Sequence, residues 1–219
     1  MGDAPWPSGP AAPLLIACAL GIEQLALRSG RRKAGDAPGK VTVLRTGMGP
    51  KAAETAVAHA LGQDRALGAA VIASGFCAGL APGMHPGDLV VADETREAGD
   101  STPCTGAGLL AEALARTVPG RTVHTGPLTG SGHVVRGHER AELRATGAIA
   151  VDMESAATLR TALRTGVRPV AAVRVVVDAP EHELVRIGTV RGGISAFRVL
   201  RAVLPAFYEW HRSLLLPRR

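Results

Sequence analysis

Three carboxylate residues stand beside apolar stretches that are typical of buried strands. Glu23 follows the run at 13–20, Glu154 lies in the segment AVDMES, and Asp178 ends the valine run in RVVVD. Because open α/β sheets bind ligands beyond the carboxyl ends of their strands, we expect these side chains to share a cleft. Asp178 is placed to donate a proton, and the Glu154 carboxylate can accept hydrogen bonds from two neighbouring hydroxyls, as on a ribose.

Each of these residues also has a purely structural explanation. Asp178 precedes Ala179 and Pro180, so it can cap a helix or begin a turn. Glu154 and Glu23 both fit the first turn of a helix, where the helix dipole favours a negative charge. Residue spacing leaves both interpretations open.

The segment TGMGP at 46–50 predicts a loop that a ligand can approach closely. Gly47 and Gly49, on either side of Met48, carry no Cβ to obstruct an anion or a sugar. The spacing is neither that of GxGxxG nor that of a P-loop, which argues against dinucleotide or triphosphate binding. The serine-containing segments GSG and DMES do not form GxSxG, so a serine hydrolase is disfavoured.

Strand-like and helix-like segments alternate along the chain. Apolar runs predict strands, several of them followed by helices that end on a glycine. The expected strands lie at 13–20, 68–80, 87–94, 122–132 and 168–178, and 41–50 is expected to hold a short strand followed by a glycine turn. The expected helices lie at 22–30, 51–62 and 138–147, and 148–166 is expected to be a strand that runs directly into a long helix.

This alternation predicts one α/β domain over residues 1–219. We expect a single-domain three-layer αβα sandwich around a mixed, mostly parallel central sheet. The continuous apolar run at 168–178 predicts a strand covered on both faces. Residues 1–12 and 211–219 are expected to be flexible termini.

Composition excludes several classes of protein. No apolar run is long enough for a membrane span and the start lacks a signal-peptide pattern, so we expect a cytoplasmic protein. Three separated cysteines and scattered histidines predict no disulfide framework and no metal site. The net charge of +6 is spread along the chain and aromatic residues make up only 3%, which disfavours nucleic-acid binding.

The C-terminal segment HRSLLLPRR combines three leucines with arginines. Such a segment can make peripheral contact with an anionic membrane surface. The alternative is an ordinary frayed basic terminus.

Taken together, the motifs resemble the superfamily of nucleoside phosphorylases and nucleosidases, which includes methylthioadenosine/S-adenosylhomocysteine nucleosidase. The resemblance covers residues 13–205 and is carried, in order, by IACALGIEQLALR, TGMGPKAAETA, ASGFCAGLAPGMHPGDLVVADE, GSGHVV, AVDMESAA and VRVVVDAPEHEL. Within it, ERAELRATGA before AVDMESAA and DAPEHEL after it are most similar to the hopanoid-associated phosphorylase branch. That branch implies release of adenine from adenosylhopane.

The resemblance also implies roles for individual residues. Asp178 would be the general acid that protonates purine N7. Glu154 would accept hydrogen bonds from the ribose hydroxyls, with Met153 beneath the sugar. Glu23 would position or activate a water molecule. Protonation lets adenine leave as a neutral base, and nearby carboxylates stabilise an oxocarbenium-like sugar.

Several residues depart from the family pattern around the base. Phe76, after Gly75, stands where nucleosidases usually carry a small polar residue, and it offers an apolar wall. Val134 and Val135 stand where relatives place a stacking aromatic, and His133 where they often have aspartate. Ordinary nucleoside substrates are therefore in doubt, and an apolar channel on the 5′ side of the ribose is expected for a lipid-like substrate.

The nucleophile is left open between water and phosphate. No arginine precedes ASGFC, where phosphate-using relatives carry one, although Arg45 and Lys51 flank the TGMGP loop. Glu23 favours hydrolysis slightly. We expect no cofactor, with phosphate open as a co-substrate, and the resemblance implies a homo-oligomer. The alternatives are a soluble nucleosidase for methylthioadenosine, S-adenosylhomocysteine or futalosine, and a non-catalytic nucleoside-binding module.

Overall fold

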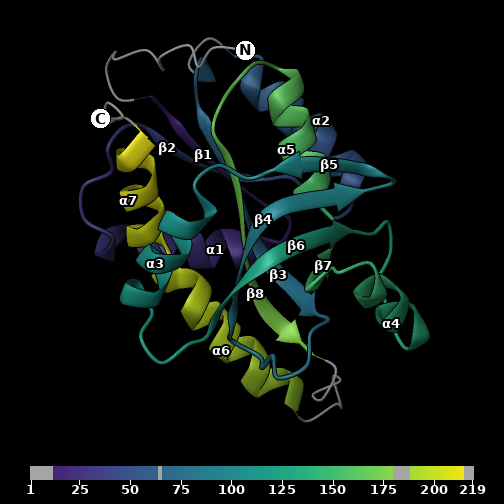
Figure 1. The fold of residues 1–219 in the computed structure, drawn as a ribbon. Coiled ribbons are helices and arrows are strands. Elements are labelled where there is room, and N and C mark those ends of the chain that lie inside the picture. Colours follow the sequence, from purple (N-terminus) through teal and green to yellow (C-terminus); the bar gives the residue numbers. More distant parts are fainter. Residues whose placement is uncertain (1–11, 64–65, 180–187, 215–219) are drawn as a thin grey trace.

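The computed structural model describes residues 12–63, 66–179 and 188–214 of the chain (Figure 1). Within these ranges the strands belong to one eight-stranded sheet. They are β1 (Leu14–Cys18), β2 (Val41–Arg45), β3 (Ala70–Gly79), β4 (Leu89–Glu97), β5 (Asp100–Pro103), β6 (Val123–Gly130), β7 (Ala150–Asp152) and β8 (Val170–Asp178).

The sheet is mixed and mostly parallel, with five parallel and three antiparallel pairings. The strand order is β2-β1-β3-β7-β6-β4-β5, and β8 pairs with both β3 and β4. Strands β3, β8, β4, β6 and β7 therefore close into a ring of pairings. The carboxyl ends of the parallel strands β1, β3 and β8 lie on one side of the sheet, where the sequence predicts a cleft.

Helices cover both faces of the sheet. They are α1 (Gly21–Gly30), α2 (Pro50–Leu61), α3 (Ala107–Thr117), α4 (His138–Ala145), α5 (Ser155–Arg164), α6 (Gly188–Ala202) and α7 (Leu204–Leu214), with a 3₁₀ turn at Arg31–Lys33. Buried residues of α1, α3, α6 and α7 form one core with the sheet, and those of α2 and α5 form a second core on the other face. In Figure 1, α4 lies apart from these layers at the edge of the molecule.

The two cores follow from the alternation of side chains along each strand. In β1, Leu14 and Ile16 belong to the first core, whereas Leu15 and Ala17 belong to the second. Strand β8 is buried on both faces over most of its length, as its continuous apolar run predicts. The expected three-layer αβα architecture is confirmed.

The sequence predicts flexible residues at both ends of the chain, and the structure describes some of these residues. The prediction of a flexible terminus over 211–219 is wrong for residues 211–214, which continue α7. His211 is buried there and Leu214 packs against the first core, because the apolar face of α7 lies on α3 and the sheet. Residues 215–219 and 1–11 lie outside the described residues, so membrane contact by the tail stays a prediction. The helices of the described ranges are too short or too polar to cross a membrane.

Candidate active site

A cavity of about 260 Å³ opens where the carboxyl ends of β1, β3 and β8 meet the junction between β7 and α5. This volume is close to the lower end of the roughly 300–1,000 Å³ that is usual for small-molecule sites. Seven of the ten predicted site residues line it: Glu23, Met48, Phe76, Val135, Met153, Glu154 and Asp178. Chain segments that are far apart in sequence therefore converge as expected.

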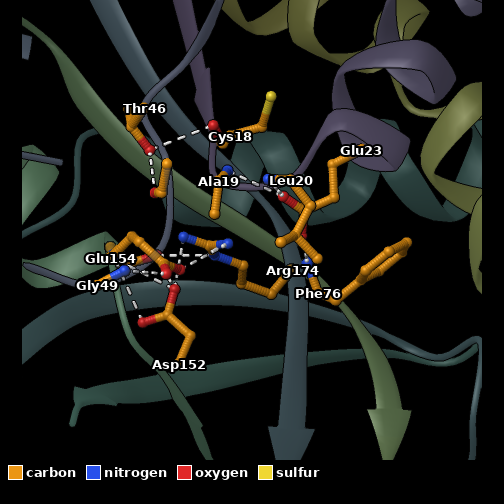
Figure 2. A network of polar contacts seen from close by, with 12 residues as sticks. Cys18, Ala19, Leu20, Glu23, Thr46, Gly49, Phe76, Asp152, Glu154 and Arg174 are labelled. Atoms are coloured by element: carbon orange, nitrogen blue, oxygen red, sulfur yellow. Dashed lines mark hydrogen bonds and ion pairs between the residues drawn. The ribbon is translucent and has the colours of Figure 1, made fainter. Parts of the chain in front are cut away.

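Glu23 is held rigidly at the first turn of α1. Its Oε2 accepts hydrogen bonds from the backbone amides of Ala19 and Leu20, at 2.9 and 2.8 Å, and its Oε1 accepts one from the Phe76 amide at 2.8 Å (Figure 2). The first two bonds are those of a helix-capping glutamate. The third ties the carboxylate to β3 and turns it toward the cavity. Glu23 therefore both caps the start of α1 and lines the cavity.

Gly75 permits this approach between α1 and β3. A Cβ on Gly75 would stand 2.5 Å from Glu23 Oε1 and 2.7 Å from the Nη1 atom of Arg174. Any side chain would displace both charged groups. Gly75 does not line the cavity, but its lack of a side chain leaves room for the Glu23 carboxylate and the Arg174 guanidinium.

Arg174 is a central residue of the site that our sequence predictions do not include. It lies on β8 and is 1% exposed, and its Nη2 pairs with Asp152 Oδ2 at 2.5 Å. Its Nε donates a hydrogen bond to Ser155 Oγ at 2.9 Å, and Nη1 lies 4.0 Å from Glu154 Oε2 (Figure 2). Burial opposes its charge, but the nearby carboxylates outweigh that effect and raise the pKa of Arg174 overall. The guanidinium is therefore the fixed positive centre of the site.

Glu154 points across the cavity rather than along α5. Its Oε1 accepts a hydrogen bond from the Gly49 amide at 2.9 Å. The amide of Ser155 is instead capped by Asp152, whose oxygens lie 3.1 and 3.3 Å away. Burial raises the pKa of Glu154, against the opposing effect of Arg174. Asp152, and not Glu154, therefore caps the first amide of α5.

The TGMGP loop contributes unequally to the site. Gly49 precedes the first turn of α2 and offers its amide to Glu154. Met48 is 67% exposed and lines both the cavity and a groove along α2 that contains Lys51 and His59. Gly47 lines neither, so the structure does not bring it to the site.

Asp178 ends β8 at the wall of the cavity, with 20% of its side chain exposed. Its Oδ2 accepts a hydrogen bond from Nη2 of Arg140 at 2.6 Å. Its Oδ1 is buried and has no partner among the described residues. Helix α6 begins only at Gly188, so Asp178 does not cap it.

The remaining walls of the cavity are mainly apolar. Phe76 and Val177 line it from β3 and β8, and Val134 and Val135 line it from the segment before α4. His133 also faces the cavity. The expected apolar wall at Phe76 is present. Groups of three or more histidine, cysteine or acidic residues that could hold a metal ion are absent from the described part of the chain.

Comparison with known proteins agrees with this architecture. A family model described as "Phosphorylase superfamily" matches residues 8–205. Among curated proteins, no match was found.

Many solved structures share the fold. The 5′-methylthioadenosine/S-adenosylhomocysteine nucleosidase from Neisseria meningitidis, in complex with methylthio-immucillin-A, superposes with a TM-score of 0.70 at 20% identity, covering 88% of this chain and 98% of that one. The nucleosidase from Colwellia psychrerythraea, in complex with adenine, gives a TM-score of 0.73 at 19% identity, with 91% and 96% covered. At such identities the likeness establishes the fold.

The family model spans most of the chain, the fold agrees with that of the solved nucleosidases, and the expected enzyme class is thereby confirmed. The chain belongs to the phosphorylase superfamily, the superfamily of nucleoside phosphorylases and nucleosidases.

Proposed function

We propose that the protein cleaves the N-glycosidic bond of an adenosine-type substrate. The observation that carries the proposal is the meeting of Glu23, Glu154 and Asp178 around one cavity of mainly apolar lining. The nucleosidases of this fold from N. meningitidis and C. psychrerythraea are described in complex with methylthio-immucillin-A and with adenine. A small-molecule nucleoside is therefore the substrate class that we propose.

Each carboxylate has a role that its surroundings support. Asp178 ends β8 at the cavity wall with 20% of its side chain exposed, so it protonates the leaving base. Glu154 accepts hydrogen bonds from the ribose hydroxyls, with Met153 against the sugar. Charge that develops on the sugar is stabilised by these fixed carboxylates.

We propose water as the nucleophile and no cofactor. A carboxylate offers about four lone-pair positions, and backbone amides occupy three of those on Glu23, which leaves one for a water molecule. Phosphate would instead be repelled by the carboxylates that already surround Arg174, which are those of Asp152, Glu154 and Glu23.

The surroundings of the TGMGP loop also favour water over phosphate. The start of α2 is a place where an anion can bind. The carboxylate of Glu154 already takes the Gly49 amide there. Both basic residues flanking the loop, Arg45 and Lys51, are exposed.

For the 5′ substituent we propose an apolar chain, as in adenosylhopane. Support comes from the apolar walls and from Met48 and Val134, which line the cavity although 67% and 65% of their surfaces are exposed. A soluble nucleosidase for methylthioadenosine, S-adenosylhomocysteine or futalosine is the second candidate, and solved nucleosidases of this fold are named for the first two of these substrates. A non-catalytic nucleoside-binding module would not need the acid at Asp178.

The deciding experiment measures adenine release from detergent-dispersed adenosylhopane, with and without phosphate, beside methylthioadenosine. Release from the hopanoid without phosphate is the expected result. Phosphate-dependent release would make the enzyme a phosphorylase. Release from methylthioadenosine alone would replace the lipid substrate by a soluble nucleoside, and no release from any of these substrates would favour the binding module.

Three further proposals concern the surroundings of the protein. We propose a homo-oligomer in the cytoplasm, with peripheral membrane contact through the basic tail from residue 215 onward. Light scattering after gel filtration tests the oligomer. Sedimentation with anionic vesicles, for the full chain and for a chain ending at Leu214, tests the tail.

A further inference from the structure

Helix α4 buries one of its side chains, and that side chain is charged. Arg140 is the buried residue of α4, whereas its sequence neighbours His138, Glu142 and Arg144 are exposed. A buried guanidinium is costly unless it is paired. Its partner is Asp178 on β8, 38 positions away in the sequence.

The two carboxyl oxygens of Asp178 have different surroundings. Arg140 Nη2 donates to Oδ2 at 2.6 Å, while Oδ1 has no partner among the described residues. Asp178 lines the cavity and 20% of its side chain is exposed, so Arg140 holds the carboxyl group in place at the cavity wall.

The segment that carries Arg140 also forms part of the cavity wall. His133 contacts Glu139 of α4, with 2.9 Å between Nε2 and Oε1, and His133 lines the cavity together with Val135. Leu143 of α4 packs against the small core cluster that includes Val135. Arg140 therefore links this wall to Asp178.

We infer that Arg140 is a positioning residue for the acid, an inference that rests on the proposed function. Arg140 holds the carboxyl group through Oδ2 and so fixes its orientation at the cavity wall. As the bond from the ribosyl carbon to the base breaks, its electron pair goes to the base and the proton moves from the Asp178 carboxyl group to a ring nitrogen. Asp178 is left as a carboxylate, and the adjacent guanidinium stabilises the negative charge that forms.

The alternative is that Arg140 only anchors α4. Two substrates separate these roles. An adenosine-type substrate needs a proton on its leaving base, whereas p-nitrophenyl riboside releases a phenolate that is stable as an anion. A loss of anchoring harms both reactions, but a loss of acid positioning harms only the first.

The test measures kcat and KM of Arg140→Met, Arg140→Lys and Asp178→Asn on both substrates, using adenosylhopane or methylthioadenosine, whichever the enzyme cleaves. We expect Arg140→Met to lower kcat for adenine release about 10- to 100-fold with little change in KM, and to leave nitrophenyl release unchanged. Arg140→Lys should recover part of the loss. The double variant with Asp178→Asn should lose no more than Asp178→Asn alone, because both changes act on one step.

Arg144→Met, on the exposed side of the same helix, is the matched control and should keep full activity. Two outcomes would overturn the inference and leave the proposed function standing. In the first, Arg140→Met loses equal activity on both substrates. In the second, Arg140→Met releases adenine at the full rate while Asp178→Asn is impaired. Full adenine release by Asp178→Asn would exclude Asp178 as the general acid. If Arg140→Met does not fold, Arg140→Lys gives the same comparison between the two substrates.

Discussion

Arg174 and Asp152 form an ion pair that is almost completely removed from water: Nη2 lies 2.5 Å from Oδ2, and the side chains are 1% and 2% exposed. Asp152 also accepts hydrogen bonds from the amide and hydroxyl of Ser155. The pair therefore joins β8 to the start of α5, and it fixes the two segments that carry Asp178 and Glu154.

Arg174→Met should destabilise the fold. It leaves a buried Asp152 without its cation, and breaking such a pair costs about 3–5 kcal/mol. Urea unfolding measures the loss. Arg164→Met on the exposed end of α5 is the control, with an expected change within about 0.5 kcal/mol. An Arg174→Met protein as stable as the unchanged one would mean that Asp152 is satisfied by other groups.

Asp178→Asn should remove most of the turnover and preserve the fold. An amide cannot supply the proton, and a positioned general acid is worth about 10²- to 10⁴-fold. Adenine release at saturating substrate gives the loss in kcat, and far-ultraviolet circular dichroism checks the fold. Unchanged turnover would exclude Asp178 as the acid.

Glu154→Gln should weaken substrate binding and turnover together. The glutamine oxygen can still accept from the Gly49 amide, so the loop keeps its position, but the charge that orders the ribose hydroxyls is lost. Hydrogen bonds to charged groups contribute about 1.5–3 kcal/mol, which corresponds to roughly 10- to 100-fold in kcat/KM. A variant that is only less stable, with normal kinetics, would argue for a structural role.

Glu23→Gln should affect both hydrolysis and stability. Backbone amides donate to both oxygens of Glu23, whereas glutamine offers one oxygen and turns its NH₂ group toward an amide donor. Leaving a buried donor unsatisfied costs about 1–3 kcal/mol. Turnover without phosphate should fall. If the only activity depends on phosphate and survives the change, Glu23 has no role in handling water.

The sequence predicts the three carboxylates because each stands at a strand end that its apolar run already marks. Glu23, Glu154 and Asp178 meet in space since β1, β7 and β8 all end at the same cleft. The alternation of strands and helices likewise predicts the layers. These are local signals, and they need no knowledge of which strands pair.

The parts that depend on pairing between distant segments were not predicted. Strand β8 pairs with β4 in antiparallel orientation, and this pairing closes the ring of strands. Helices α3, α6 and α7, which are not among the expected helices, complete the layer on one face of the sheet. Arg140 reaches Asp178 only because the tertiary fold brings α4 next to the end of β8. Nothing near Arg140 in the sequence indicates its partner.

Arg174 did leave a usable signal. An arginine inside an otherwise apolar buried strand requires buried acidic partners. The alternation of β8 places it on the same face as Ala172 and Val176, toward α5, where Asp152 and Ser155 lie. A search for acidic residues at the start of the preceding helix would have found the pair.

His211 should make the fold sensitive to mild acid. It is 1% exposed in α7, and neither ring nitrogen has a partner among the described residues. Burial lowers the pKa of His211 from 6.5 to about 4. The unfolded chain therefore binds the proton near pH 6.5, whereas the folded chain binds it only near pH 4. Stability is retained above this window and lost as the pH falls through it.

The full loss between these pH values is at most about 3.5 kcal/mol, since one pKa unit corresponds to about 1.4 kcal/mol. Urea unfolding at several pH values between 7 and about 4 measures it. His211→Leu removes the titrating group and should flatten the dependence, whereas His59→Leu on the exposed face of α2 should leave it intact. If His211→Leu loses stability toward low pH as steeply as the unchanged protein, other groups dominate the acid response.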